Sequence, residues 1–369
     1  VADARYSRYI PEYLARTLLW LPPVQLDEMI THITGLLASS NDGIVMRALD
    51  TMGYLLRYFP KYPERFSINE EDYCHRRHLL LGAILKGMAC YRESVRQEAM
   101  MVLSDVFSDE SELEEMAMSV EEKYYLFTTG CRKILFLLSE VEGGDISLFA
   151  RASAVSSISN FISQWRMDHQ TFDVIEWSKV AFLPGTFDPF TRSHKEIMRK
   201  IRDQGFEVYL AVDEFSWSKK AQPHLIRRKI VNMSVADEFH VNIFPYQIPI
   251  NIANPRDLQH LKELFAPREV YMVTGSDVIT NASSYRKPVT EHSIHTMNHI
   301  IFRRGKDMDS DILDALKTVH GKVEIVDLPK EFRDISSTML RENIDLNRDV
   351  SNLVDPMVQG YIYSSGLYL

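Results

Sequence analysis

The stretch AFLPGTFDPFTRSH, residues 181–194, decides how the second half of this chain folds. It places a short apolar run, the single glycine Gly185 and a helical pattern beginning near His194 in direct succession. A glycine there lets the backbone turn sharply and approach a ligand closely. Thr191, Ser193 and His194 fall in or beside the first turn of the predicted helix, where free N–H groups and the helix dipole favour a phosphate. The alternative is an ordinary N-cap beside a surface histidine.

A second stretch of the same kind, DISSTMLRE, occupies residues 334–342 and follows the apolar run VEIVDLP. Ser336, Ser337 and Thr338 open a predicted helix, and Arg341 lies one turn further on. Hydroxyl groups and a guanidinium in this arrangement predict a second anion site, with a simple Ser/Thr cap and a solvent-facing arginine as the alternative. Two such places, each after a predicted strand, favour phosphate binding.

Apolar runs that alternate with helical patterns follow residue 179 and predict an α/β domain. The runs are VAFLPGTF (180–187), EVYLAV (207–212), HVNIFPY (240–246), EVYMVTG (269–275), NHIIFRRG (298–305) and VEIVDLP (323–329). Asn254 and Pro255 supply an N-cap and first-turn pair for one intervening helix. This alternation predicts a Rossmann-like parallel sheet covered on both faces. Ligands bind such sheets at the carboxyl ends of the strands, so the residues just after each strand are the candidates.

The first half of the chain, up to about residue 177, has a helical hydrophobic pattern nearly throughout. Residues 24–39, VQLDEMITHITGLLAS, carry apolar side chains at three- and four-residue steps, which is typical of a buried helix stripe. Three other stretches resemble one another and place Arg47, Arg96 and Arg151 near their starts. This pattern favours HEAT-like helical repeats, with an irregular bundle as the alternative.

Length and net charge limit how many domains the chain can form and which classes of partner it can bind. A chain of 369 residues is long enough for two domains, and we expect an all-α domain over residues 1–178 and an α/β domain over residues 179–369. The net charge of −9 gives no global support for nucleic-acid or membrane binding, so any phosphate site must be local. Because helical repeats commonly present an extended surface, we expect the first domain to dock a protein partner.

The cysteines and the apolar runs indicate the compartment. Cys74, Cys90 and Cys131 are widely spaced and form no disulfide framework, which fits a reducing cytoplasm. No apolar run reaches the about 18 residues that a membrane helix needs, and no secretory signal is visible. The sequence begins with Val1 instead of methionine, as expected for a piece of a longer protein.

Other clusters of polar residues carry weaker signals. His292, His295 and His299 would share one face of a helix, but their segment runs into a predicted strand, so we expect no metal site there. The stretch CHRRH, residues 74–78, reads as a solvated basic helix start. The acidic run at residues 109–122 reads as a solvated loop and helix face.

The two phosphate stretches together resemble the signatures of the nucleotidylyltransferase superfamily, H/T-x-G-H and I-S-S-T-x-x-R. GTFDPFTRSH and ISSTMLR carry that resemblance. Four further stretches are most similar to nicotinamide- and nicotinate-mononucleotide adenylyltransferases: VYMVTGSDVI, IIFRRGKD, VDEFSWSKKAQPHLIRRKIVNMSVADEF and LVDPMVQGYIYSSGLY. The resemblance spans about residues 180–369 and leaves out the helical half.

The resemblance implies that a mononucleotide phosphate attacks the α-phosphate of ATP and that pyrophosphate leaves, with Mg²⁺ as a helper ion. It implies that His194 and Arg341 contact the ATP phosphates and that Thr191 stands in the place of the first signature histidine. The other residues that it places at the nucleotide are Gly185, Thr186, Phe187, Gly275, Asp277, Ser336, Ser337, Thr338, Lys219 and Lys220, with Arg303 and Arg304 as weaker candidates.

Several positions depart from the pattern of the family. Ser193 and Pro184 stand where many relatives have glycine, and Ser193 adds a side chain where the phosphates approach. Tyr285 lies near the place of a tryptophan that stacks on the pyridine ring in relatives. These departures keep two alternatives open. One is transfer to another acceptor such as pantetheine phosphate, or from a cytidylyl donor, and the other is a degenerate nucleotide-binding module. The sequence does not decide whether the acceptor is nicotinate or nicotinamide mononucleotide. It does not give the oligomeric state either.

Overall fold

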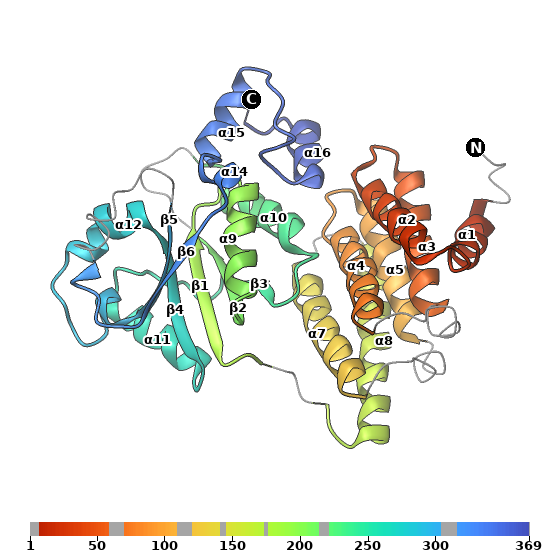
Figure 1. The fold of residues 1–369 in the computed structure, drawn as a ribbon, viewed down its shortest axis with the longest axis horizontal. Helices are drawn as coiled ribbons and strands as arrows, with labels where there is room; N and C mark the ends of the chain where they lie inside the picture. The colour runs from red at the N-terminus through yellow and green to blue at the C-terminus, as the bar shows by residue number, and fades with distance from the viewer. Residues whose placement is uncertain are drawn as a thin grey trace. The chain divides into compact units, whose positions relative to one another are not determined.

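The computed structural model divides into two compact units, each described here by itself (Figure 1). Unit 1 comprises Val1–Ile175 with Val235–Phe239, and unit 2 comprises Glu176–Ser234 with His240–Leu369. The predicted domain ranges, 1–178 and 179–369, remain predictions about which parts fold independently. The structure describes residues 7–58, 70–108, 120–140, 145–172, 176–213, 221–303 and 316–368.

The regular secondary structure described in unit 1 consists of helices, as predicted. Its elements are η1 (Ser7–Tyr9), α1 (Ile10–Leu18), α2 (Pro23–Gly35), η2 (Leu36–Ala38), α3 (Asp42–Tyr58), α4 (Glu70–Met88), α5 (Glu93–Ser108), α7 (Val120–Ser139) and α8 (Asp145–His169). The predicted stripe is the buried side of α2, through Leu26, Ile30 and Ile33. Helices α3, α5 and α8, which carry the three similar stretches, pack in that order against one another. The HEAT-like assignment remains a prediction.

The stretch CHRRH is not a solvated helix start, so that prediction is wrong. It lies inside α4, and both Arg76 and Arg77 are buried. The Arg76 guanidinium donates two hydrogen bonds to Asp27 of α2, at 2.5 Å (Nε–Oδ1) and 2.8 Å (Nη2–Oδ2). This hydrogen-bonded charge holds the pKa of Asp27 below its ordinary value. The partner comes from a distant helix, and the local sequence therefore could not show it. The acidic run at 109–122 lies mainly outside the described residues.

Asp50 of α3 is a partly buried carboxyl group that keeps its proton near neutral pH. Arg47 Nη1 lies 2.7 Å from Asp50 Oδ2 and favours the charged form. Burial, the hydrogen bond with Glu98, and repulsion from Glu98 and Asp105 outweigh that contact and raise the pKa of Asp50 to about 8.

We expect this proton to make the chain less stable as pH rises. A group whose folded pKa lies above its unfolded value stabilises the fold fully below the unfolded pKa of about 4, and this stabilisation is lost as pH rises through the folded pKa. Replacing Asp50 with Asn should therefore flatten the fall of the urea midpoint between about pH 5 and pH 8. The midpoint is measured by far-UV circular dichroism.

The matched control is Asp27→Asn. Because the folded pKa of Asp27 is lowered, its contribution is present above the unfolded pKa and is lost only as pH falls below it. The control should leave the slope between about pH 5 and pH 8 unchanged. An Asp50→Asn variant with the wild-type slope would contradict the assignment.

Unit 2 contains the predicted parallel sheet. Its strands are β1 (Lys179–Gly185), β2 (Phe206–Val212), β3 (Val241–Ile243), β4 (Glu269–Gly275), β5 (Asn298–Arg303) and β6 (Val323–Asp327), and each lies within or overlaps one predicted run. The strand order is β3-β2-β1-β4-β5-β6, with every neighbouring pair parallel. The chain leaves β1 toward one edge and returns through β4 toward the other, so the order reverses between β1 and β4. Ligands of such sheets bind beside that reversal.

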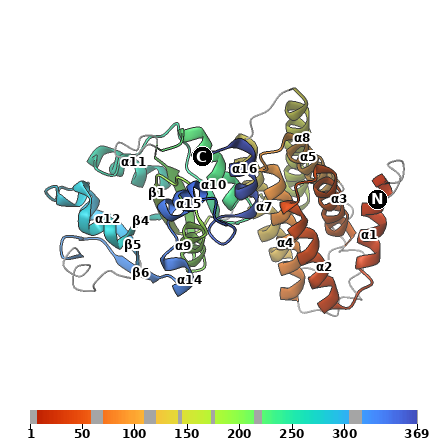
Figure 2. The same ribbon diagram turned by 90° about the horizontal axis from the view of Figure 1, so that it is seen from above.

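Helices flank the sheet of unit 2. They are α9 (Arg192–Arg202), α10 (His224–Val235), α11 (Pro255–Phe265), α12 (Ser276–Asn281), α14 (Lys330–Arg333), α15 (Ser337–Asp345) and α16 (Pro356–Ser365), with η5 (Ser283–Arg286) and η6 (Ile294–Thr296). Helices α9 and α11 lie on opposite sides of the strands (Figure 2). The predicted cap of α11 is confirmed, because the Asn254 side chain accepts from the Arg256 N–H at 3.1 Å.

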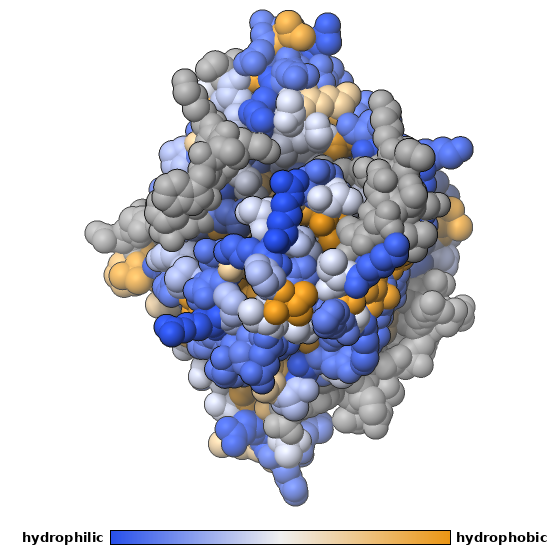
Figure 3. Space-filling model, turned by 90° about the vertical axis from the view of Figure 1, so that its left-hand side faces the viewer, coloured by the Kyte–Doolittle hydropathy of each residue, from blue (hydrophilic) through white to orange (hydrophobic). Residues whose placement is uncertain are grey.

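At the end of unit 2 that carries α12, the surface has a hydropathy pattern that is common in globular proteins. That end is mainly hydrophilic, with hydrophobic residues in small patches, as on most solvent-facing surfaces (Figure 3). In the described part of the chain, no helix combines the length and the apolar character that crossing a membrane requires.

The turn after β1 departs in detail from the prediction. The left-handed backbone belongs to Phe187, with φ of 48°, and not to Gly185. Gly185 is required for space, because a Cβ there would lie 2.8 Å from ring atoms of Phe187. The Phe187 ring is buried over the glycine, so the turn is held by packing as well as by backbone freedom.

Candidate functional site

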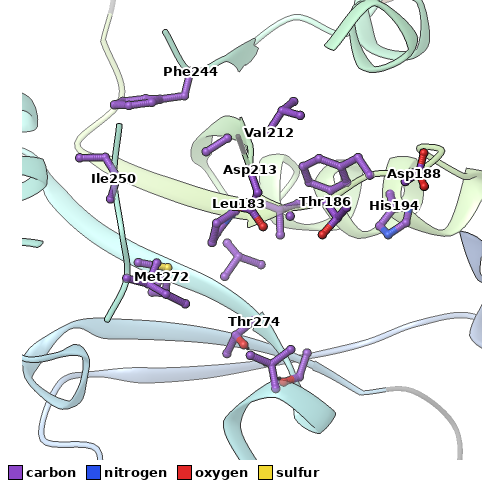
Figure 4. Close-up of a pocket in the computed structure, with 18 of the residues that line it drawn as sticks. Leu183, Thr186, Asp188, His194, Val212, Asp213, Phe244, Ile250, Met272 and Thr274 are labelled. Carbon is purple, nitrogen blue, oxygen red and sulfur yellow. Dashed lines mark hydrogen bonds between the residues drawn. The ribbon is translucent and has the colours of Figure 1, made fainter. Parts of the chain in front are cut away.

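One cavity of 730 Å³ lies at the carboxyl ends of the strands in unit 2. Segments after β1, β2, β3 and β4 line it, together with the start of α15. Figure 4 shows Phe244 and Ile250 on the opposite side of the drawn residues from His194 and Asp188. Most of the predicted site residues are brought together at this cavity: Gly185, Thr186, Phe187, His194, Gly275, Asp277, Ser336, Ser337, Thr338 and Arg341.

His194 lies in the first turn of α9 with a defined tautomer. Its Nδ1 accepts the backbone N–H of Thr191 at 3.0 Å, so the proton of the neutral ring sits on Nε2. The Thr191 hydroxyl lies 2.9 Å from the same Nδ1, and the rings of Phe187 and Phe190 pack against the imidazole at 5.3 Å between centroids. The local sequence thus presents an oriented N–H donor at a helix N-terminus, where an anion binds favourably.

Thr191 and Ser193 are placed differently from His194. Both are buried, and neither lines the cavity. Thr191 acts on the site through its contacts with His194. The expectation that Ser193 adds a side chain where phosphates approach is wrong, because the side chain is fully buried and does not line the cavity. Its hydroxyl meets no hydrogen-bond partner among the described residues.

The start of α15 forms the second polar wall. Ser336 is its N-cap and accepts the Met339 N–H at 3.1 Å. Ser337 Oγ donates to the Pro189 carbonyl at 2.9 Å, and Arg341 Nη1 donates to the Asp188 carbonyl. These two bonds join the start of α15 to the loop before α9. Two helix N-termini, His194 and a guanidinium therefore converge on one cavity.

Asp188 is a site residue that the sequence reasoning quoted within a motif but did not select. Its Oδ1 accepts from the Tyr368 hydroxyl at 2.7 Å and from the Gln222 N–H at 3.2 Å. Its Oδ2 lies 3.6 Å from Arg341 Nη1. Burial and the hydrogen bond to this carboxylate raise the pKa of Tyr368. The Phe-Asp-Pro triplet was the available signal, but the partners come from three distant segments.

Gly275 and Asp277 follow β4 at the cavity. A Cβ at Gly275 would lie 2.4 Å from Asp277 Oδ1, so only glycine leaves room for this carboxylate. Arg303 ends β5 and faces Asp327 at 3.4 Å, and it does not line the cavity. Lys219, Lys220 and Arg304 lie outside the described residues.

Apolar side chains line much of the rest of the cavity, and several of them come from a segment that the sequence reasoning missed. Residues 244–252, directly after β3, supply Phe244, Ile248, Ile250 and Ile252. The signal was a run of proline and isoleucine, FPYQIPINI, in an apparent loop. Such a run after a strand is apolar enough to cover a ligand, but only the strand order places it at the cavity.

Tyr285 also lines the cavity, and His299 holds it. His299 Nδ1 contacts the Met297 carbonyl at 2.9 Å, so this nitrogen carries the proton and Nε2 accepts from the Tyr285 hydroxyl at 2.9 Å. Burial lowers the pKa of His299 to about 4, which keeps the ring neutral. The hydroxyl of Tyr285 is therefore turned toward β5.

Two histidines of the predicted weak cluster, His295 and His299, make different hydrogen bonds. His299 lies in β5 and binds Tyr285, whereas His295 lies in η6 with Nε2 at 3.2 Å from the Lys287 carbonyl. Across the described ranges, no group of three His, Cys, Asp or Glu side chains is placed to hold a metal ion.

Comparisons with known proteins find matches to the C-terminal half of the chain. Residues 182–343 match the family model described as cytidylyltransferase-like. A probable nicotinate-nucleotide adenylyltransferase of Flavobacterium psychrophilum is 27% identical over 199 residues, which cover 52% of this chain and 98% of the relative. A protein of the same name from Clostridium botulinum is 25% identical over 209 residues, covering 51% and 98%.

A solved structure of similar length to the C-terminal half was also found. It is the Plasmodium falciparum nicotinic acid mononucleotide adenylyltransferase complexed with NaAD, with 21% identity, a TM-score of 0.43 and coverage of 52% of this chain and 97% of that one. The match to the family model is a match of sequence. The residues that line the cavity lie within the matched range, 182–343. Residues 182–343 therefore resemble a cytidylyltransferase-like domain, and these matches support a nucleotidyltransferase in the C-terminal half of the chain.

Proposed function

We propose that unit 2 transfers the adenylyl group of ATP to nicotinate or nicotinamide mononucleotide, forming a dinucleotide and pyrophosphate. The observation that carries this proposal is the cavity itself. His194 and Arg341, near two helix starts, line one cavity, and many of its other lining residues are apolar, Tyr285 among them. Polar donors for a triphosphate and an apolar wall for a flat ring are what this pair of substrates requires.

The reaction needs positioning and charge stabilisation but no covalent enzyme intermediate. An oxygen of the acceptor phosphate forms a bond to the α-phosphorus of ATP, and the bond from that phosphorus to the oxygen bridging it to the β-phosphate breaks. Pyrophosphate leaves with the electron pair. In the proposal His194 Nε2–H and Arg341 stabilise the charge that develops on the phosphate oxygens, Ser336, Ser337 and Thr338 hold the triphosphate, and Thr191 orients His194.

The remaining polar residues take supporting roles in the proposal. Gly275 and Asp277 hold the adenosine ribose, and the backbone of Gly185, Thr186 and Phe187 approaches the phosphates. Lys219 and Lys220 add positive charge.

Mg²⁺ bound to the triphosphate would neutralise part of its charge. The described residues fit an ion carried by phosphate oxygens, because Asp188, Asp213 and Asp277 line the cavity without forming a three-ligand cluster.

The test is pyrophosphate release from ATP with Mg²⁺, with nicotinate mononucleotide and nicotinamide mononucleotide side by side and a reaction without acceptor as the blank. Turnover with either acceptor supports the proposal and identifies the acceptor. No release with both acceptors overturns it. A screen with pantetheine phosphate and with CTP then separates another transferase from a nucleotide-binding module. The buried position of Ser193 removes one argument for such a module.

We expect Tyr285 to contribute its ring and not its hydroxyl. Because the hydroxyl donates to His299, Tyr285→Phe should keep kcat and the acceptor KM within about twofold, while lowering the free energy of unfolding by about 1 kcal/mol through the lost hydrogen bond. Tyr285→Ala should raise the acceptor KM by about 5- to 100-fold, since stacking of a base on an aromatic ring contributes about 1–3 kcal/mol. Steady-state kinetics with the preferred acceptor provide the measurement.

The matched control is Tyr363→Ala, which removes an exposed tyrosine on α16. It should leave both constants unchanged. Equal losses in Tyr285→Phe and Tyr285→Ala would show instead that the hydroxyl meets the substrate.

A separate proposal concerns the helical half. We propose that unit 1 docks a protein partner and that the protein acts in the cytoplasm, where its cysteines Cys74, Cys90 and Cys131 remain free thiols as in the structure.

A further inference from the structure

Two consecutive arginines at the start of α10, Arg227 and Arg228, lie behind the cavity. They are only 2% and 4% exposed, and neither lines the cavity. Burial of a guanidinium is unfavourable unless its donors are satisfied, so the acceptors show what these side chains do.

Arg227 donates to backbone carbonyls of three separate segments. Nη1 donates to Thr186 O at 2.5 Å, Nη2 to Asp213 O at 2.7 Å and Nε to Gln222 O at 2.8 Å. Thr186 is the first residue after β1, and Asp213 is the first residue after β2. One rigid fork of donors therefore joins the ends of two adjacent strands to the loop that leads into α10.

Arg228 continues this arrangement to the third strand. Its Nη1 donates to Phe244 O at 2.9 Å, and Phe244 is the first residue after β3. The guanidinium carbon also lies 5.3 Å from the centre of the Tyr246 ring, two residues further along the same segment. The pair thus contacts the first residue beyond each of three neighbouring strands.

All three of these first residues line the cavity. Figure 4 shows Thr186 near His194, Asp213 between, and Phe244 on the far side near Ile250. These three carbonyl groups lie at the point where each strand ends. There they accept hydrogen bonds from arginine side chains. Asp188 and Asp213 face Arg227. Burial lowers the pKa of Arg227, and the negative charge of the two aspartates opposes part of that shift.

We propose that Arg227 and Arg228 are positioning residues that set the spacing of the three strand-end segments and so align the acceptor phosphate with the α-phosphate of ATP. This inference rests on the proposed adenylyl transfer. Arg227 joins the phosphate side to the middle of the cavity, so it governs alignment. Arg228 holds the segment that supplies the apolar wall, so it governs the fit of the acceptor.

The experiment compares Arg227→Lys and Arg228→Lys with Arg256→Lys, an exposed arginine on α11, as the matched control. A lysine keeps the charge but cannot reproduce the fork. We expect R227K to lower kcat by about 10- to 100-fold, because misplacement by about 1 Å is enough for such a loss, and to weaken ATP binding by about tenfold, because Thr186 lies on the phosphate side of the cavity. R228K should raise the acceptor KM by about tenfold and leave the KM for ATP within about twofold.

The outcomes separate this inference from the proposed function. If the wild type turns over and R227K keeps kcat within about threefold, or if R228K moves both KM values equally, the positioning role is overturned. If circular dichroism shows that R227K is unfolded, the kinetics of R228K decide whether the pair has a positioning role. R228K leaves the three hydrogen bonds of Arg227 intact.

If the wild type releases no pyrophosphate with either acceptor, the proposed function fails. Calorimetry with ATP then tests the pair: weaker binding by about tenfold in R227K than in the wild type supports the positioning of the phosphate side, and equal affinity overturns it.

Discussion

His194→Ala should lower kcat for pyrophosphate release by about 10²- to 10³-fold, with the KM for ATP changing by much less. The structure orients the imidazole so that Nε2 is its donor nitrogen, because Nδ1 accepts the N–H of Thr191. Removal of one preorganised donor to a developing oxyanion typically costs this much in kcat. Steady-state kinetics of the purified variant with saturating acceptor give both constants.

The same substitution also removes an acceptor from the first turn of α9, so stability must be measured beside activity. We expect only a small fall in the melting temperature, because one capping contact contributes about 1 kcal/mol. His260→Ala is the matched control, since His260 is an exposed histidine on α11. A His194→Ala enzyme within about fivefold of the wild-type kcat would rule out the assigned role.

Arg341→Ala should lower kcat/KM for ATP by about 10²- to 10³-fold. The guanidinium lies beside Asp188, with 3.6 Å between Nη1 and Oδ2, and donates to Thr338 Oγ1 at 3.3 Å. Its removal deletes a charged donor to the triphosphate. It also leaves the Asp188 carboxylate, which lines the cavity, with less compensating positive charge toward an anionic substrate. Arg341→Lys should recover part of the loss, because a point charge remains but the fork does not.

A double-mutant cycle with Asp188→Asn isolates the second effect. In the R341A background, neutralising Asp188 should recover about tenfold in kcat/KM for ATP, and the recovery should shrink at high salt. Arg256→Ala, an exposed arginine elsewhere in unit 2, should change neither constant. Additive losses in the double variant would show that Asp188 and Arg341 do not act together at the substrate.

Local patterns in the sequence were sufficient for the elements and for the centre of the site. The apolar runs after residue 179 correspond to β1–β6, because a buried parallel strand requires a short continuous apolar segment wherever it lies in the chain. His194 and Ser336 were found at helix starts, because capping depends on residues only a few positions apart. The strand-end rule then brought these helix starts to one cavity.

Local patterns were misleading where a partner lies far away in the sequence. CHRRH is basic, and only the packing of α4 on α2 supplies Asp27 and so permits burial of Arg76. By contrast, the strand predicted to interrupt the helical spacing of His292, His295 and His299 is present, since His299 lies in β5.

The walls of the cavity depend on contacts between distant segments. Asp188 meets Tyr368 across 180 residues, and Arg227 meets Thr186 across 41. The apolar residues 244–252 reach the cavity because β3 lies two strands from β1. Periodicity and capping are properties of neighbouring residues, so they are legible in the sequence. The partner of a buried charge follows from strand order and packing, which arise only when the whole unit folds.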